Sequence, residues 1–598
     1  MSPQHQTAEQ WAGGNPAARP GSRSPSRRRT AVPAIAAAAL LLLCLLAASS
    51  AAAPGSAQKL PLPGRERPNV IVIQLDDASS VAAYQTYFDL LTGGQVPAMP
   101  NTMRLLVQGG MTFTRYYTPD PLCCPSRVSM LSGSYAKNTD VKGNGPNGGG
   151  YPQFVGRDVG YENLPVWLKR AGYRTIHIGK FLNYYGEPPY SSPNDIPPGW
   201  SDWETLVGEQ STHLFYGYTM NDNGTLTGPY GDSTYAVKDP AGCPYAPPPG
   251  EHCNYQTDVF TQRAVSQIAA SAVSGRPFFL SLDYVAPHGD FRNPSGPEPA
   301  PRHYDSLATM PLPKPPGFNE GNVNDKPSFI RFAPLLTSIE IRRIKIEYRK
   351  EVESLRAVDD GVANIIGALH DTGELSNTYI FFTSDNGFFQ GEHRLQRSKF
   401  LPYEPAVRVP MFVRGPGVQR GSRSGELAAN IDLAPTILAL ARARPTRAMD
   451  GRSLLPFLED PTERTQRALL LEAFTRSVDV GTARGASGAR ARSAVATASV
   501  DPLPEDYYGI RVGRYKYIEY ADGQKELYDL ALDPYELNSR QKNRRYFPVR
   551  AFLHKWLLRL ENCRGVSCKR PIPELVPDPN PLHPGRHKQG QGGQGQTP

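Results

Sequence analysis

The stretch NVIVIQLDD, residues 69–77, indicates the fold class of this 598-residue chain. Its apolar run is rich in β-branched residues and ends in Asp76 and Asp77. A short continuous apolar run is typical of a strand buried on both faces, as in parallel sheets covered by helices. The two aspartates would then lie at the carboxyl end of the strand, where open α/β sheets bind their ligands.

Further apolar runs repeat this arrangement along the chain. They are YRTIHIGK ending at Lys180, PFFLSLDYVAPH ending at His288, TYIFFTSDN ending at Asp385 and Asn386, and VPMFVRGPG ending in a Gly-Pro-Gly stop. Helical patterns separate them, and the longest spans residues 339–370 with apolar residues at helical spacing. Strands alternating with helices predict an α/β fold with a large, mostly parallel sheet.

Other regions differ in composition. Residues 186–256 are rich in Pro, Gly and Tyr without a clear period, which predicts a long loop over the site. A smaller α+β unit is predicted over 459–575, with a low-complexity insertion at 477–505, a hairpin in YYGIRVGRYKYIEYADGQKELYDL and a helix near 549–560. The Gln- and Gly-rich tail, 576–598, is predicted to be disordered.

The first 57 residues have the composition of an export signal. A basic segment with Arg27, Arg28 and Arg29 precedes an apolar run at 34–48, and small residues follow. This order is typical of a secretory signal peptide, and the arginines are compatible with twin-arginine export. An uncleaved anchor is the alternative, although the run falls short of the ~20 apolar residues that a membrane span needs. We therefore expect a secreted protein, with its main α/β domain over residues 66–458.

The net charge bears on which macromolecules the chain binds, and export bears on whether it forms disulfide bonds. The formal net charge is +9, but the leader holds five Arg against one Glu, so the remaining bias is mild. We expect no nucleic-acid partner and no stable membrane partner. An exported chain can form disulfides, and Cys243 with Cys253, and Cys563 with Cys568, are local pairs that could close small loops.

The stretch PLCCPSRVSMLSG sets Cys123 and Cys124 side by side. Adjacent cysteines are poorly placed for a disulfide with one another. Pro125 suits the first turn of a helix and Gly133 can end it, so Cys123 would lie at a helix N-terminus, where backbone N–H groups favour anions. Arg127 follows one turn later, on the same side as Cys123.

Polar residues at two distant strand ends offer oxygen ligands for a metal ion. Asp76 and Asp77 follow one strand, and Asp385 and Asn386 follow another. Each pair taken alone is more often a cap or a turn. Converging carboxylates without a cation would be very costly to bury, so together they predict a hard divalent cation. A site dominated by protein oxygens suits Ca²⁺ better than Mg²⁺.

A family resemblance follows from the cysteine stretch. The pattern C-x-P-x-R beginning at Cys123, followed by LSG, resembles the signature of the type I, formylglycine-dependent sulfatases, with Ser132 where threonine is usual. The stretches CCPSR, GKFLNYYG, TGELSNTYIFFTSDNG, YEPAVRVPMFVRGPG, ANIDLAPTILAL and MDGRSLLPFL resemble the N-acetylglucosamine-6-sulfatases and related heparan 6-O-endosulfatases. The resemblance runs from about residue 69 to 458, and ELYDLALDPYELN resembles the C-terminal sulfatase unit. It implies an alkaline-phosphatase-like α/β/α sandwich with a smaller C-terminal unit of antiparallel strands.

The resemblance also implies roles for single residues. A separate formylglycine-generating enzyme would oxidise Cys123 to formylglycine, whose hydrate supplies a nucleophile that can release sulfate. The implied metal ligands are Asp76, Asp77, the modified Cys123, Asp385 and Asn386. The implied catalytic residues begin with Cys123, which becomes the aldehyde. Arg127 and Lys180 would hold the aldehyde hydrate and sulfate. His288 and Lys399 would face sulfate and the leaving oxygen. Cys124 would be a packed bystander.

One position departs from the family pattern. Many sulfatases have Lys-x-His after this strand, whereas Leu182 stands in that place here, followed by Asn183. The base that this histidine provides is therefore left unassigned. Asn183 and His393 are possible substrate contacts.

The predicted function is that of a secreted sulfatase. Its expected substrates are 6-O-sulfate esters of N-acetylglucosamine-type glycans and small aryl sulfates. Aromatic residues of the 186–256 segment either line a sugar pocket or pack the loop, namely Trp200, Trp203, Tyr216 and Tyr218. The alternatives are a phosphodiesterase or phosphonate monoester hydrolase of the same superfamily, and a non-catalytic protein that binds sulfated glycans.

Overall fold

The computed structural model describes residues 67–79, 86–89, 94–231, 254–293, 295–474, 506–572 and 576–579. The predicted leader, the low-complexity insertion at 477–505 and the predicted Cys243–Cys253 disulfide lie outside the described residues. Most of the tail that was predicted to be disordered lies outside them too. Within the described part of the chain, no helix combines the length and the apolar character needed to cross a membrane.

Strand β1 (Asn69–Asp76) lies inside the large sheet, and all its residues are buried. It pairs in parallel with β10 (Phe278–Pro287) on one side and β11 (Thr378–Ser384) on the other, and β10 pairs in parallel with β6 (Arg174–Gly179). Ten strands form this sheet in the order β13-β4-β12-β11-β1-β10-β6-β7-β8-β9. The outer strands are β4 (Met111–Phe113), β12 (Met411–Arg414), β13 (Ser422–Ser424), β7 (Asp202–Leu206), β8 (Tyr218–Asp222) and β9 (Thr225–Tyr230). The α/β sheet predicted from the apolar runs is confirmed.

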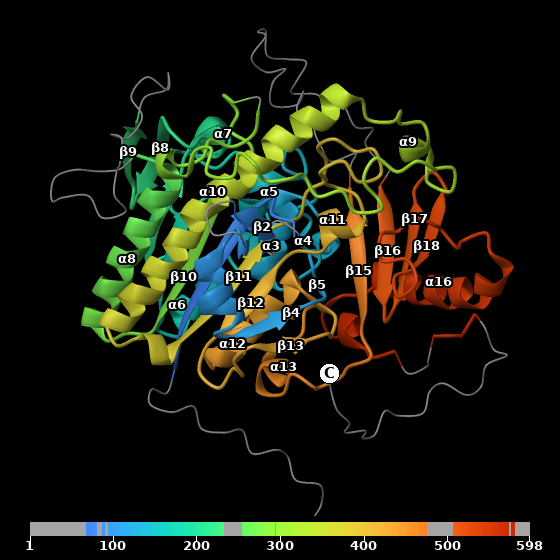
Figure 1. The fold of residues 1–598 in the computed structure, drawn as a ribbon. Coiled ribbons are helices and arrows are strands. Elements are labelled where there is room, and N and C mark those ends of the chain that lie inside the picture. Colours follow the sequence, from blue (N-terminus) through green and yellow to red (C-terminus); the bar gives the residue numbers. More distant parts are fainter. Residues whose placement is uncertain are drawn as a thin grey trace, which may run out of the picture. The chain divides into compact units, whose positions relative to one another are not determined.

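Helices cover both faces of this sheet (Figure 1). Alternate residues of a strand point to opposite faces, so Val70 and Val72 pack with α3 (Cys123–Ser132), α6 (Leu164–Arg170) and α12 (Leu433–Leu440). Ile71 and Ile73 pack with α8 (Gln256–Ser274) and α10 (Ser338–Asp371). The helix predicted at 339–370 is confirmed as α10, and a capping box between Thr337 and Glu340 marks its start. The fold is the three-layer sandwich that the resemblance implies.

The segment predicted as a long loop over the site is instead partly regular structure. It contains β7, α7 (Gly208–Ser211), β8 and β9, which extend the large sheet beyond β6. The strands are short and their polar residues interrupt the alternation, so no period shows in the sequence. The four aromatic residues proposed for a sugar pocket are buried in the two cores, namely Trp200, Trp203, Tyr216 and Tyr218. These side chains pack the interior of the fold, so the alternative that they line a sugar pocket is wrong.

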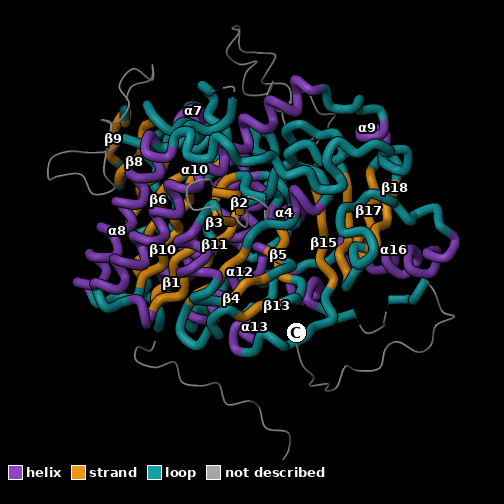
Figure 2. The backbone as a smooth tube through the Cα atoms, in the orientation of Figure 1, coloured by secondary structure: helices purple, strands orange, loops and turns teal. Residues whose placement is uncertain are grey.

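A second sheet follows the large sheet along the chain (Figure 2). It is antiparallel throughout and consists of β15 (Ala468–Ala473), β16 (Tyr507–Val512), β17 (Tyr515–Tyr520) and β18 (Lys525–Asp529). Helix α16 (Phe547–Glu561) packs on it, and Cys563 and Cys568 form the predicted disulfide. The smaller α+β unit is therefore confirmed. Its core includes residues from before the second sheet, because Leu401 and Tyr403 belong to the same buried cluster.

The remaining elements are short. They are β2 (Thr86–Asp89), β3 (Gly94–Pro97), α2 (Pro100–Thr102), β5 (Tyr116–Tyr117), α4 (Ala136–Thr139), α5 (Gly150–Val155), α9 (Ser328–Arg331), α11 (Glu404–Val407), β14 (Ala428–Ala429) and α13 (Leu455–Glu459).

Candidate active site

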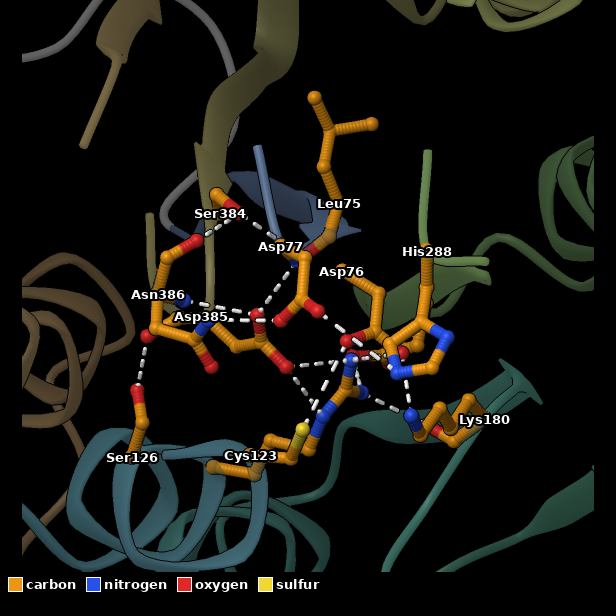
Figure 3. Close-up of polar contacts among 12 residues, drawn as sticks. Leu75, Asp76, Asp77, Cys123, Ser126, Lys180, His288, Ser384, Asp385 and Asn386 are labelled. Carbon is orange, nitrogen blue, oxygen red and sulfur yellow. Dashed lines mark hydrogen bonds and ion pairs between the residues drawn. The ribbon is translucent and has the colours of Figure 1, made fainter. Parts of the chain in front are cut away.

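The carboxyl ends of β1 and β11 bring four oxygen-bearing side chains together (Figure 3). Asp77 adopts a left-handed φ of 67°, which turns the chain sharply after β1. Its backbone N–H donates to Asp385 Oδ1 at 3.1 Å, and Asn386 Nδ2 donates to Asp77 Oδ1 at 2.6 Å. Asp76, Asp385 and Asn386 are fully buried. The residues that sequence analysis placed at these two strand ends therefore form one cluster.

Helix α3 directs its first two cysteines to different neighbours. Cys123 Sγ lies 3.7 Å from Asp76 Oδ1 and accepts a hydrogen bond from Lys399 Nζ at 3.0 Å. Cys124 Sγ accepts the backbone N–H of Asn183 at 3.2 Å instead. Only Cys123 therefore faces the carboxylate cluster. Gly133 ends the helix with a left-handed φ of 67°, as the sequence predicts.

The thiol of Cys123 is held in its neutral form. Burial raises its pKa to about 12, although the ammonium groups of Lys399 and Lys180 act in the opposite direction. A catalytic cysteine that attacks directly needs a lowered pKa, because the thiolate is the nucleophile. This environment does not favour thiolate chemistry at Cys123.

Arg127 joins the carboxylates of three strands. Its Nε donates to Asp385 Oδ2 at 3.0 Å, and Nη1 donates to Asp283 Oδ1 at 3.2 Å. Nη2 lies 3.6 Å from Asp76 Oδ2. Burial raises the pKa of Asp385 to about 7, because Asp76 repels its charge as well, and burial raises that of Asp283 to about 6. The buried site cannot keep all of these carboxylates ionised unless further positive charge lies beside them.

Two lysines contribute positive charge to the cluster. Lys180 Nζ forms an ion pair with Asp76, and Lys399 Nζ donates to Asp77 Oδ1 at 2.6 Å. Burial by itself would raise the pKa of Asp76, but the charge of Lys180 holds it well below its usual range. Both ammonium groups thus contact the carboxylate cluster directly.

His288 lies at the end of β10, opposite Asp77. Its Nδ1 is 2.9 Å from the carbonyl of Gly289, and its Nε2 is 3.6 Å from Asp77 Oδ2. The carbonyl can only accept, so Nδ1 carries the ring proton when the imidazole is neutral. Burial lowers the pKa of His288 to about 4. The nitrogen that faces the cluster is therefore the unprotonated one.

The donor set fits a hard divalent cation. One ligand atom from each of Asp76, Cys123 and Asp385 lies within 4.8 Å of the others. Asn386 Oδ1 is buried and has no hydrogen-bond partner among the described residues. A buried amide oxygen without a partner is costly, and a cation coordinated by the neighbouring carboxylates would satisfy it.

Comparison with known proteins identifies the family of this chain. A family model described as Sulfatase matches residues 68–443. The chain belongs to the sulfatase family. It is a sulfuric ester hydrolase, and the family generally uses a metal ion and a formylglycine.

Relatives of this sulfatase cover most of its length. It is 31% identical over 521 residues to N-acetylglucosamine-6-sulfatase of Homo sapiens, covering 85% of this chain and 87% of that protein. It is 29% identical to an arylsulfatase of Volvox carteri, covering 86% of this chain and 77% of that one. A solved structure described as a complex with its substrate D-glucosamine-2-N,6-O-disulfate shares the fold, with a TM-score of 0.62 and 22% identity over 84% of this chain and 98% of that one.

Two residues predicted as possible substrate contacts have structural partners in this sulfatase. Asn183 Nδ2 donates to Glu209 Oε1 at 2.7 Å, and its backbone holds Cys124. His393 is 1% exposed, and its Nδ1 lies 2.6 Å from Glu320 Oε2. No contact described in the structure joins His393 to the carboxylate cluster. The sequence analysis therefore placed His393 closer to the reacting groups than the structure does.

Sequence reasoning missed other neighbours of the site in this sulfatase. Asp283 binds Arg127 from within β10, and a polar residue inside a buried apolar run is a signal that could have revealed it. His213 Nε2 lies 3.2 Å from Lys180 Nζ. It comes from the segment predicted as a loop, and no periodicity or motif in the sequence marks it.

Proposed function

We propose that this sulfatase hydrolyses 6-O-sulfate esters of N-acetylglucosamine-type glycan units, and also aryl sulfates, using formylglycine formed at Cys123. The observation that carries the proposal is that the side chains of the two adjacent cysteines contact different neighbours. Cys123 faces Asp76 and Lys399, whereas Cys124 is bonded to Asn183. The C-x-P-x-R pattern also begins at Cys123 and not at Cys124. Of the two thiols, only that of Cys123 contacts charged side chains in the described structure.

The proposed cation is Ca²⁺, held by Asp76, Asp77, Asp385 and Asn386 together with the modified residue 123. The converging buried carboxylates and the unpartnered Asn386 Oδ1 support it. The cation and the formylglycine hydrate would supply electrophilic activation of sulfate and a nucleophilic hydroxyl. Arg127 would hold Asp385 and Asp76 in the orientation that the cation needs, because it bonds both carboxylates.

The basic residues would serve the sulfate group and the leaving alcohol. Lys399 Nζ lies between Asp77 and Cys123, so it would hold a sulfate oxygen beside residue 123. Lys180 would do the same from the side of Asp76. Lys399 would protonate the departing alkoxide, which is a poor leaving group. His288 would do so only after its Nε2, which carries no proton in the structure, had taken one up.

The choice of substrate is supported by the relatives. The human protein of similar length is named an N-acetylglucosamine-6-sulfatase, and the Volvox protein an arylsulfatase. We further propose secretion through the leader at 1–57, a catalytic domain at 66–458 and a C-terminal subdomain at 459–575.

The substrate is tested by measuring, with chromatography, the sulfate released from 6-sulfated N-acetylglucosamine. Aryl phosphodiester and phosphonate monoester assays are run in parallel. Faster turnover of the phosphorus esters would favour the phosphonate hydrolase alternative.

Peptide mass spectrometry tests the role of Cys123. Active protein should carry an aldehyde at residue 123 and an intact thiol at 124. Cys123→Ala should abolish turnover, and Cys124→Ala, which removes only a contact with Asn183, should retain most of it. The reverse pattern would contradict the proposal.

A further inference from the structure

A buried imidazole outside the predicted site contacts Lys180. His213 follows α7 and is 4% exposed. Its ring stacks on Phe291 with centroids 4.1 Å apart, and it lies 4.6 Å from the ring of His288. Its Nε2 is 3.2 Å from Lys180 Nζ. These contacts fix both the position and the plane of the ring.

The neighbours of His213 determine which ring nitrogen carries the proton. An ammonium group can only donate, so Nε2 must accept from Lys180. Nδ1 is 3.0 Å from the carbonyl of Glu209, which can only accept, so Nδ1 carries the hydrogen. Burial, Lys180 and His288 lower the pKa of His213 well below its usual value, while Asp76 and the Glu209 carbonyl act in the opposite direction. The ring is therefore a neutral imidazole with its lone pair directed at Lys180.

The ammonium of Lys180 depends on such an acceptor. Its side chain is fully buried, and a buried ammonium is costly unless its hydrogens are bonded. One hydrogen is used by Asp76 and a second by His213. With two of its hydrogens bonded in this way, the ammonium stays beside Asp76, and its charge lowers the pKa of the Cys123 thiol against the effect of burial.

We propose that His213 is a positioning residue for Lys180, whose ammonium it holds against Asp76 through the Nε2 lone pair. This inference rests on the role proposed above for Lys180 in holding sulfate. His213 would act through Lys180 and would not touch the substrate itself. A side chain at position 213 that accepts a hydrogen bond should therefore support turnover, and an apolar one of similar size should not.

The hydrogen bond can be tested without turnover. Full-length Cys123→Ala protein, labelled with ¹⁵N-histidine, gives imidazole signals, and the one lost in the further variant His213→Gln belongs to His213. We expect an unprotonated Nε2 and a protonated Nδ1 between about pH 5 and 8, where an ordinary imidazole titrates. Lys180→Met should shift the Nε2 signal. A protonated Nε2, or a signal that Lys180→Met leaves in place, would overturn the inference.

Kinetics of the matured enzyme test the consequence. His213→Leu should lower kcat about 10–150-fold with a KM change below about threefold, as for the loss of one hydrogen bond to a charged group. His213→Gln, whose Oε1 can accept from Lys180, should stay within about fivefold of the wild type. His303→Gln is the matched control, because the described side-chain contact of His303 is with Asp360, outside the site.

The two variants are compared at equal folded fraction, measured by thermal unfolding. If His213→Gln loses as much kcat as His213→Leu, or if His213→Leu retains full kcat, the positioning role is wrong. Failure of the substrate proposal looks different. In that case the wild type would not release sulfate from the 6-sulfated sugar, while the ¹⁵N signals of His213 would remain as described.

Discussion

Replacing Lys399 should separate two contributions to catalysis. Its Nζ donates to Asp77 Oδ1 at 2.6 Å and to Cys123 Sγ at 3.0 Å, and the side chain is 12% exposed. In Lys399→Ala, Asp77 keeps its bond from Asn386 Nδ2 at 2.6 Å, so the carboxylate cluster should persist. The variant therefore removes a charge from the reacting centre more than it removes structure.

The expected magnitude follows from the kind of contact that is lost. Removal of one preorganised donor to developing charge lowers kcat by about 10²–10³-fold, and this loss should apply to every sulfate ester. If Lys399 also protonates the leaving oxygen, the alkoxide of a sugar should suffer a further loss of about 10²–10⁴-fold. Nitrophenolate leaves without that proton. The ratio of the losses on 6-sulfated N-acetylglucosamine and nitrophenyl sulfate thus isolates proton donation.

The assay is steady-state kinetics of both substrates at one pH, with Lys326→Met as the control. Lys326 is also a buried ammonium, paired with Glu320 at 3.4 Å and Asp325 at 3.3 Å, but it does not contact the carboxylate cluster. The control should lose stability without a change in kcat per folded molecule. Equal losses on both substrates in Lys399→Ala would refute the leaving-group role, and His288→Ala should then show the larger loss on the sugar.

The remaining predictions concern the metal and the packing. Asp385→Ala should lose activity and also its bound Ca²⁺, which elemental analysis measures. The circular dichroism spectrum should stay native, because Arg127 keeps its contact with Asp283. Full activity without any divalent cation would contradict the metal site. Trp203→Ala should lower the free energy of unfolding by about 3–5 kcal/mol in a urea titration but leave the KM of folded enzyme unchanged, because this side chain is fully buried in the core. Tyr403→Phe should cost about 1–3 kcal/mol, since its hydroxyl donates to buried Glu526 at 2.8 Å; an unchanged urea midpoint would count against that bond.

The large sheet and its ligand edge were predictable because the signals are local. A buried parallel strand reads as an apolar run, and the polar residues that end it must lie at one edge of the sheet. This was sufficient to bring Asp76 and Asp385 together, although more than 300 residues separate them. The strands at the far edge were missed because β7 to β9 are short and mix polar with apolar residues. His213 was missed for a related reason, since its partners come from tertiary structure and no spacing in the sequence records them.

The C-terminal sheet also contributes to the arrangement of the site. Lys399 lies in the segment that leads into α11, and this segment is bonded to the second sheet. Lys516 Nζ of β17 lies 2.8 Å from Glu404 and 2.6 Å from Glu536, and the hydroxyl of Tyr403 is bonded to Glu526 of β18.

These ion pairs and hydrogen bonds are buried, so breaking one partner would leave an uncompensated charge. That energetic cost disfavours movement of the segment after Lys399. The Lys399 backbone is therefore held where its ammonium contacts Asp77 and Cys123. The site thus uses two kinds of support. Strand ends of the large sheet hold the carboxylates, whereas contacts with the smaller sheet hold the lysine that faces them.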